Sequence, residues 1–162
     1  TEIEQFVAFS KTYQELGLRL PEWQDVGEMF KRAAQQIDTR NVAVNVNISG
    51  VSILCDPLFE KVCYNLIENA IRHGGDLTHI EVGGTETITG FLITVEDDGT
   101  GIPDEQKMFI FDRGFGKNTG YGLFLTREIL SLSDITITEN GQFGVGCRFE
   151  IDVPKGKYRK ES

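Results

Sequence analysis

The chain has 162 residues, of which 40% are hydrophobic, enough to build the core of one compact domain. Its 25 acidic residues outnumber 16 basic ones, and the net charge of -9 would repel nucleic acid or an anionic membrane. The chain does not open with a basic segment followed by an apolar stretch, and its apolar runs are short. We therefore expect a cytoplasmic segment without a signal peptide. If the segment belongs to a longer protein, that protein could still carry a membrane anchor elsewhere.

Residues 2–16 carry apolar side chains at three- and four-residue steps, which predicts an amphipathic helix ending at Gly17. Residues 18–24 break this pattern and are expected to form a linker. A second helix is predicted from about Asp25 to Ile37. The first helix is too short to have a core of its own, so we interpret it as the end of a longer helical element.

Alternating apolar residues predict a pair of strands at 42–48 and 51–54, joined by a turn at Ser49-Gly50. Asp56 and Pro57 suit the N-cap and first position of a long helix that continues to Gly74. Further strands are predicted at residues 80–83, 91–96, 135–138 and 147–153, with a short helix after Pro103 and a longer one over 123–132.

This succession of strands and helices predicts an α+β fold. We expect a two-layer α/β sandwich, in which a mixed sheet of about five or more strands is covered on one face by about three helices. The basic tail at residues 155–162 is expected to be disordered. The three cysteines lack the spacing of a metal site and are expected to be buried thiols in a reducing compartment: Cys55, Cys63 and Cys147.

The long helix carries a polar arc with two asparagines one turn apart, Asn65 and Asn69. Asparagine is a mediocre helix former, so a merely solvated face would favour Lys and Glu. The pair therefore indicates contact with a ligand, or alternatively caps and bridges to backbone groups within the packed domain. The other members of this arc are Lys61, Glu68 and Arg72.

The segment Asp97-Asp98-Gly99-Thr100-Gly101 follows a predicted strand. Its two glycines allow the backbone to approach a flat ligand closely, and a carboxylate there can accept a hydrogen bond from an amine such as that of adenine. A plain Asp-Gly turn has the same composition, so this segment alone leaves both interpretations open.

A glycine-rich loop, residues 114–122, leads into the helix predicted at 123–132, so its amides could face phosphate oxygens. It is not a Walker A loop, because Phe111 and Asn118 stand where that pattern needs glycine and Ser or Thr. It is not a G-x-G-x-x-G motif either, because Thr119 occupies the third glycine position. Lys117 could reach a phosphate as a point charge, or be an ordinary solvated lysine.

In this order, these features resemble the catalytic ATP-binding domain of sensor histidine kinases. That domain has the Bergerat fold of the GHKL superfamily, which includes DNA gyrase, MutL and heat-shock chaperone ATPases. The resemblance extends from about Ile53 to Pro154. Its motifs are an N box at 65–73, a G1 box at 97–101, an F box at 110–115, a G2 box at 120–123 and a final glycine motif from 144.

The resemblance implies a role for each of these residues. Asn69 and Asn65 would hold the Mg²⁺ that bridges the phosphates, and Asn65 in place of a water-activating Glu favours phosphotransfer over hydrolysis. Asn69, Glu68 and Lys117 would be the catalytic residues. ATP would also contact Arg72, His73, Asp97, Gly99, Gly101, Ile102, Thr119, Gly120, Tyr121, Gly122 and Leu123.

The family's phosphoacceptor is a histidine followed by an acidic residue, and neither His73 nor His79 fits that pattern. We therefore expect a fragment of a parent kinase, with residues 1–22 as the end of a dimerisation helix and a linker, and 23–154 as the catalytic domain. Its expected partners are ATP, the phosphoacceptor dimerisation helix and a response regulator, in a parent that is a homodimer. No nucleic-acid or membrane partner is expected for this fragment.

Two other functions stay open from the sequence. The first is a degenerate nucleotide-binding sensor that transfers no phosphate, and the second is an anti-sigma-type serine/threonine kinase of the same superfamily. Intact Asn69 and Asp97 favour activity, and the helical start disfavours the second alternative. Phe124 and Cys147 depart from the family pattern, which has glycine and Thr or Ser there. Phe124 could stiffen the lid, which is the glycine-rich loop at 114–122, and Cys147 could remove a polar contact near adenine.

Overall fold

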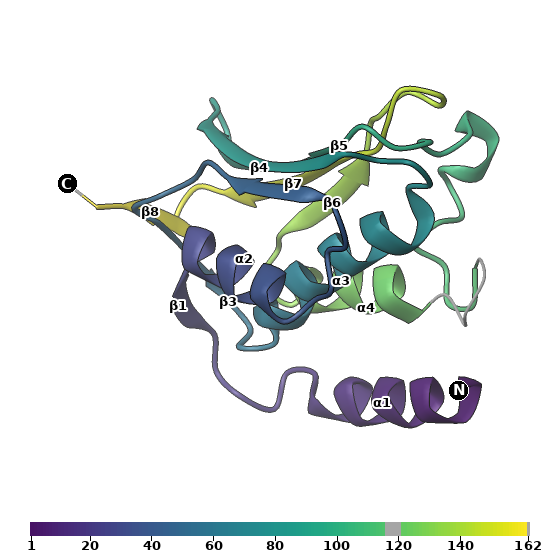
Figure 1. Ribbon diagram of the computed structural model, residues 1–162. Coiled ribbons are helices and arrows are strands. Elements are labelled where there is room, and N and C mark those ends of the chain that lie inside the picture. Colours follow the sequence, from purple (N-terminus) through teal and green to yellow (C-terminus); the bar gives the residue numbers. More distant parts are fainter. Residues whose placement is uncertain (116–120, 162) are drawn as a thin grey trace.

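The computed structural model describes residues 1–115 and 121–161, which form four α-helices, one short 3-10 helix and eight strands. A five-stranded sheet, a layer of three helices and the N-terminal helix lie one below another in Figure 1. In chain order the elements are α1 (Glu2–Glu15), β1 (Glu22–Asp25), α2 (Val26–Gln35), β2 (Ala43–Val46), β3 (Val51–Cys55), α3 (Phe59–His73), β4 (His79–Glu86), β5 (Gly90–Asp97), η1 (Asp104–Gln106), α4 (Tyr121–Ser131), β6 (Thr136–Glu139), β7 (Arg148–Pro154) and β8 (Tyr158–Lys160).

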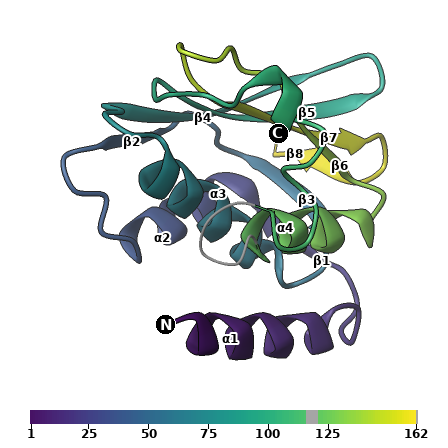
Figure 2. The ribbon, with the colours of Figure 1, turned by 90° about the vertical axis from the view of Figure 1, so that its right-hand side faces the viewer.

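The main sheet has the strand order β2-β4-β5-β7-β6, and it is mixed because β2 runs parallel to β4 while the other neighbours are antiparallel. Ile93 pairs with Ile151, which pairs with Ile137, so one buried apolar row crosses three strands. Helices α2, α3 and α4 cover one face of this sheet (Figure 1). The predicted α+β sandwich is confirmed, and α1 adds a further layer outside the helices, as Figure 2 shows.

The predicted pairing of the strands at 42–48 and 51–54 is wrong. β2 joins the main sheet, whereas β3 pairs with β1 and β8 in a second, three-stranded sheet. Apolar alternation identifies a strand but does not identify its partner, which depends on contacts distant in sequence. The second sheet also corrects the linker prediction, because Glu22–Asp25 is the strand β1.

The C-terminal tail at residues 155–162 was predicted to be disordered, but part of it is ordered. Tyr158–Lys160 form β8, which pairs with β3. The Tyr158 ring lies 5.3 Å from that of Phe91, and its hydroxyl donates to the Glu86 carboxylate over 2.9 Å. One aromatic anchor therefore orders a segment that looks disordered by composition.

The start of α3 also differs from the prediction, because the helix begins at Phe59 rather than at Pro57. Asp56 belongs to the turn before the helix: its Oδ1 accepts the Leu58 N–H over 2.9 Å. Its Oδ2 accepts the Gly17 N–H over 3.3 Å, so the carboxylate ties the segment after α1 to the start of α3. The described helices include none that is both long and apolar enough to cross a membrane.

Candidate functional site

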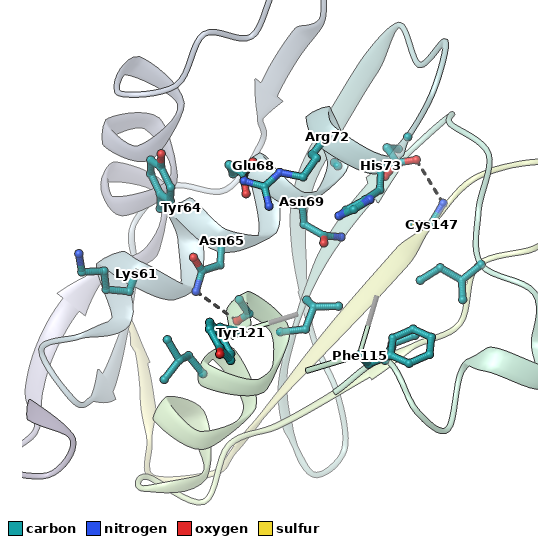
Figure 3. Close-up of a pocket in the computed structure, with 18 of the residues that line it drawn as sticks. Lys61, Tyr64, Asn65, Glu68, Asn69, Arg72, His73, Phe115, Tyr121 and Cys147 are labelled. Atoms are coloured by element: carbon teal, nitrogen blue, oxygen red, sulfur yellow. Dashed lines mark hydrogen bonds and ion pairs between the residues drawn. The ribbon is translucent and has the colours of Figure 1, made fainter. Parts of the chain in front are cut away.

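A cavity of about 990 Å³ lies along one side of α3 (Figure 3), and residues of α1, the start of α4 and the loop after β5 also line it. Eleven of the residues to which the resemblance assigns a role in the site line it, although they come from three separate segments of the chain. They are Asn65, Glu68, Asn69, Arg72, His73, Asp97, Gly101, Ile102, Tyr121, Gly122 and Leu123. Lys117, Thr119 and Gly120 lie outside the described residues.

Asn65 and Asn69 project from successive turns of α3 towards the cavity (Figure 3). The Asn65 amide nitrogen donates to the Gly122 carbonyl over 3.2 Å, and the Thr126 hydroxyl donates to the same carbonyl over 2.9 Å. Asn65 therefore bridges to backbone, as the alternative interpretation held, and it ties α3 to the start of α4. Because the bond uses its NH₂ group, its carbonyl oxygen remains suited to a ligand.

Glu68 and Arg72, one turn apart on α3, form an ion pair of 2.8 Å. Their side chains are 27% and 37% exposed, so the pair lies at the mouth of the cavity rather than in its depth. A partly exposed pair of this kind contributes little to stability and can exchange partners readily. Arg72 can therefore turn from Glu68 to an anionic ligand.

Asp97 ends β5 and is the buried carboxylate of the cavity, only 7% exposed. Its Oδ1 accepts the Gly99 N–H over 2.8 Å and the Cys147 N–H over 3.2 Å. Burial raises the pKa of Asp97 above its ordinary value, while the two backbone donors oppose that shift. Both bonds go to Oδ1, so Oδ2 is the oxygen that remains for a ligand.

The glycine loop after Asp97 packs closely against two other segments. A Cβ on Gly99 would stand 2.4 Å from the Gly74 carbonyl oxygen, and the Thr100 N–H donates to that oxygen over 3.0 Å. Gly99 therefore supports the loop from behind and is not among the lining residues. Gly101 does line the cavity, with φ of 80°, and a Cβ there would meet the Gln142 carbonyl oxygen at 2.8 Å.

Several lining residues were missed by the sequence reasoning. They include Phe9 and Thr12 from α1 and Tyr64 from α3, whereas Lys61 was recognised only as a member of the polar arc. The apolar periodicity of α1 predicts that Phe9 is buried but not against which element. The arrangement therefore adds a wall that the motifs do not contain.

The expectation of three buried cysteines holds for Cys55 and Cys63 but is wrong for Cys147, which is half-buried and lines the cavity. Burial raises the pKa of the Cys147 thiol to about 12, and the nearby Asp97 carboxylate acts in the same direction. The thiol therefore stays protonated beside the Asp97 carboxylate at neutral pH.

Comparison with known proteins identifies the family of the chain. The family model described as "Histidine kinase-, DNA gyrase B-, and HSP90-like ATPase" matches residues 56–157. The chain is similar to sensor protein KdpD of Escherichia coli, with 28% identity over 83% of this chain and 16% of KdpD. It is also similar to alginate biosynthesis sensor protein KinB of Pseudomonas aeruginosa, with 38% identity over 59% of this chain and 17% of KinB. The chain thus spans less than a fifth of either relative.

Solved structures share the fold. The mycobacterial sensor histidine kinase MprB has a TM-score of 0.76 at 18% identity, covering 88% of this chain and 100% of that one. Full-length ShkA, solved in complex with AMPPNP, has a TM-score of 0.77 at 16% identity, covering 99% of this chain and 36% of that one. Since the family model matches more than half of the chain, the chain belongs to the histidine kinase-, DNA gyrase B- and HSP90-like ATPase family, and it corresponds to the catalytic ATP-binding domain of sensor histidine kinases.

Proposed function

We propose that this chain binds ATP and Mg²⁺ and transfers the ATP γ-phosphoryl group to a histidine on a dimerisation helix, in two-component signal transduction. One observation carries the proposal: a single cavity is lined by the buried, hydrogen-bonded carboxylate of Asp97 and by two carboxamides of α3, those of Asn65 and Asn69. An adenine nucleotide needs both an acceptor for its amine and polar groups near its phosphates.

Asp97 accepts the adenine amine in this proposal. Its orientation is set by the Gly99 and Cys147 amides, so the base meets an acceptor that is already in place. Gly101 and Ile102 supply the adjacent wall. His73 lines the cavity at the end of α3 and lies beside the base or ribose.

The phosphates and Mg²⁺ face the polar side of α3. Among the described residues no three His, Cys, Asp or Glu side chains gather to hold a metal, so the oxygen ligands come from Asn69, Asn65 and the phosphates themselves. This donor set fits Mg²⁺, which prefers oxygen and keeps few protein ligands when it binds with phosphates. When bound, Mg²⁺ neutralises charge on the transferring phosphoryl group.

Further residues surround the phosphates of ATP in this proposal. Arg72 leaves Glu68 to contact phosphate, and Glu68 then faces the incoming imidazole of the acceptor histidine. Tyr121, Gly122 and Leu123 begin α4 at the cavity and present the lid helix. Lys117, Thr119 and Gly120, which lie outside the described residues, are also proposed to contact the phosphates.

We also propose how the chain is divided into a helical segment and a catalytic domain, and which proteins it acts with. Residues 1–22 are the end of a dimerisation helix and its linker, and 23–154 are the catalytic domain, which the β3–β8 pairing extends to Lys160. The acceptor helix belongs to a homodimeric parent kinase, and the phosphoryl group passes on to a response regulator.

Isothermal titration of the chain with ATP, with and without Mg²⁺, tests the site. We expect ATP to bind and Mg²⁺ to strengthen that binding. Asn69→Ala should lose most of the strengthening by Mg²⁺. Asn45→Ala is the matched control, because Asn45 lies on β2 and its exposed amide contacts Glu81 over 3.3 Å. A wild-type chain that binds no ATP would refute the proposal, and equal Mg²⁺ dependence in Asn69→Ala would remove the metal assignment.

A further inference from the structure

A buried ion pair between Lys107 and Glu139 lies beside the Asp97 end of the cavity. The Glu139 side chain is 1% exposed and that of Lys107 is 19% exposed. Lys107 Nζ also donates to the Gly141 carbonyl over 2.6 Å. Glu139 Oε2 accepts two backbone amides, from Gly141 over 2.8 Å and from Arg148 over 3.0 Å. Burying two charges is costly, so their neighbours must satisfy them in one geometry.

The Glu139 side of the pair leads directly to Asp97. Arg148, whose amide Glu139 holds, follows Cys147, whose amide donates to Asp97 Oδ1 over 3.2 Å. The Cys147 carbonyl in turn accepts the Asp97 N–H over 3.0 Å. Glu139 therefore holds the Cys147–Arg148 peptide, whose carbonyl accepts the Asp97 N–H and which directly follows the amide that orients the Asp97 carboxylate.

The Lys107 side of the pair leads to a second segment that lines the cavity. Gln106 precedes Lys107 and Ile110 follows it, and both line the cavity. Through Lys107 this segment is fastened to Glu139 and to the Gly141 carbonyl. The ion pair therefore joins the Asp97 end of the cavity to this second lining segment.

We propose that Lys107 and Glu139 are positioning residues that set the preference of this site for adenine over guanine. The inference rests on the proposed ATP site. A fixed carboxylate oxygen accepts a hydrogen bond from the amine of adenine, but it repels the carbonyl oxygen that guanine has at the same place. A site discriminates strongly only where its polar group stays in position, and here the ion pair keeps Asp97 in position.

The variant Glu139→Gln tests this directly. A glutamine has one acceptor oxygen, whereas Glu139 uses one oxygen for Lys107 and the other for two backbone amides. Glutamine therefore cannot keep both the contact with Lys107 and the contacts with the two backbone amides, and one of the two lining segments is released. We expect ATP affinity to fall roughly tenfold with GTP affinity little changed, because the loss is that of one hydrogen bond to a charged group.

The readout is the ratio of ATP to GTP affinity, measured by isothermal titration at a temperature where circular dichroism shows each variant folded. A purely structural role lowers the folded fraction, which weakens both nucleotides equally and leaves the ratio unchanged. Lys107→Met should lower the ratio as Glu139→Gln does, and Lys107→Arg should keep it by retaining the charge. Lys160→Met breaks an exposed 2.8 Å pair with Glu86 and should leave both affinities unchanged.

Two failures are distinguishable in this experiment. If the wild-type chain binds no ATP, the proposed function fails and this inference fails with it. If the wild type prefers ATP to GTP and both Glu139→Gln and Lys107→Met keep the same ratio, the site stands and the positioning role is refuted.

Discussion

Asp97 and Asp98 are neighbours in sequence with opposite surroundings. Asp97 is buried in the cavity, whereas Asp98 accepts the Thr78 and His79 amides over 2.8 and 3.1 Å outside it. Successive residues in an extended segment point to opposite sides, which separates the two carboxylates. The resemblance assigned the adenine contact to Asp97, and Asp97 is the one of the two that lines the cavity.

Asp97→Asn tests the adenine contact. Asparagine can keep its carbonyl oxygen on the Gly99 and Cys147 amides, but its NH₂ group then faces the adenine amine, donor against donor. We expect ATP affinity to fall about 10- to 100-fold, the value of a hydrogen bond to a charged group. Isothermal titration and thermal unfolding measure affinity and fold separately. Unchanged ATP affinity would show that the base pocket is assigned to the wrong carboxylate.

Asp98 predicts a pH dependence of stability. The Thr78 hydroxyl and the two amides, with His79 Nδ1 at 3.2 Å, hold the pKa of Asp98 well below its ordinary value. An Asp pKa that is lower in the folded than in the unfolded chain stabilises the fold at pH values above the unfolded-state pKa of about 3.9. This stabilisation is lost progressively as the pH falls from there towards the lower pKa of the folded state. Urea unfolding between pH 7 and pH 3 should show a smaller loss for Asp98→Asn than for the wild type. Parallel losses would contradict this role.

At the scale of elements, α1 is coupled to the lid helix α4. Phe9 is 5% exposed, and its ring stacks on that of Tyr121 with centroids 4.2 Å apart. The Arg113 guanidinium lies 4.9 Å from the centroid of the Phe9 ring. Because α1 also lines the cavity, its position bears on access to the site.

Phe9→Ala should release α1 without unfolding the sheet. Truncating a buried Phe costs about 3–5 kcal/mol in a packed core, and here the loss falls on the contact between α1 and α4. Hydrogen exchange should become faster at the amides of 2–15, while those of β5 and β7 stay protected. Val7→Ala is the control, because Val7 is 60% exposed. Equal exchange in both variants would show that Phe9 does not hold α1.

The elements differ in how far sequence could predict them. The amphipathic patterns of α1 and α3 were sufficient to predict that these segments are helices, because a helix forms its backbone hydrogen bonds between residues close in sequence. The partners of β2 and β3 could not be predicted, because apolar alternation is the same in either sheet. The strand β1 lacks clear alternation, and its assignment depends on pairing with β3.

At the scale of the molecule, the second sheet joins segments from both ends of the chain. β3 lies between β1 and β8, and the exposed Glu86 accepts hydrogen bonds from Tyr158 and Lys160. The tail is therefore part of the folded unit rather than an appendage.

Truncation after Lys157 should destabilise the whole chain, because it removes β8 and the Tyr158 contacts. We expect a loss of about 1–2 kcal/mol, which lowers Tm by roughly 2–8 °C for a domain of this size. Differential scanning calorimetry measures the change. Removing only residues 161–162 keeps β8 and serves as the control. An unchanged Tm after the longer truncation would show that β8 adds no stability.

The site as a whole was predictable where motifs exist. Asn65, Asn69 and Asp97 belong to recognised patterns, and the structure brings them to one cavity. The pair Lys107 and Glu139 belongs to no motif, and its members are 32 positions apart. Contacts of this kind arise only when the fold brings distant segments together, so no local pattern predicts them.

Transfer to histidine is tested most directly by incubating the chain with Mg²⁺, γ-labelled ATP and the dimerisation helices of the proposed parent kinase. We predict that the helices acquire label that is labile in acid and stable in base, as expected for phosphohistidine. The label should disappear with Asn69→Ala, which loses the proposed metal ligand. Acid-stable label, or no label from a chain that still binds ATP, would contradict the proposed transfer to histidine.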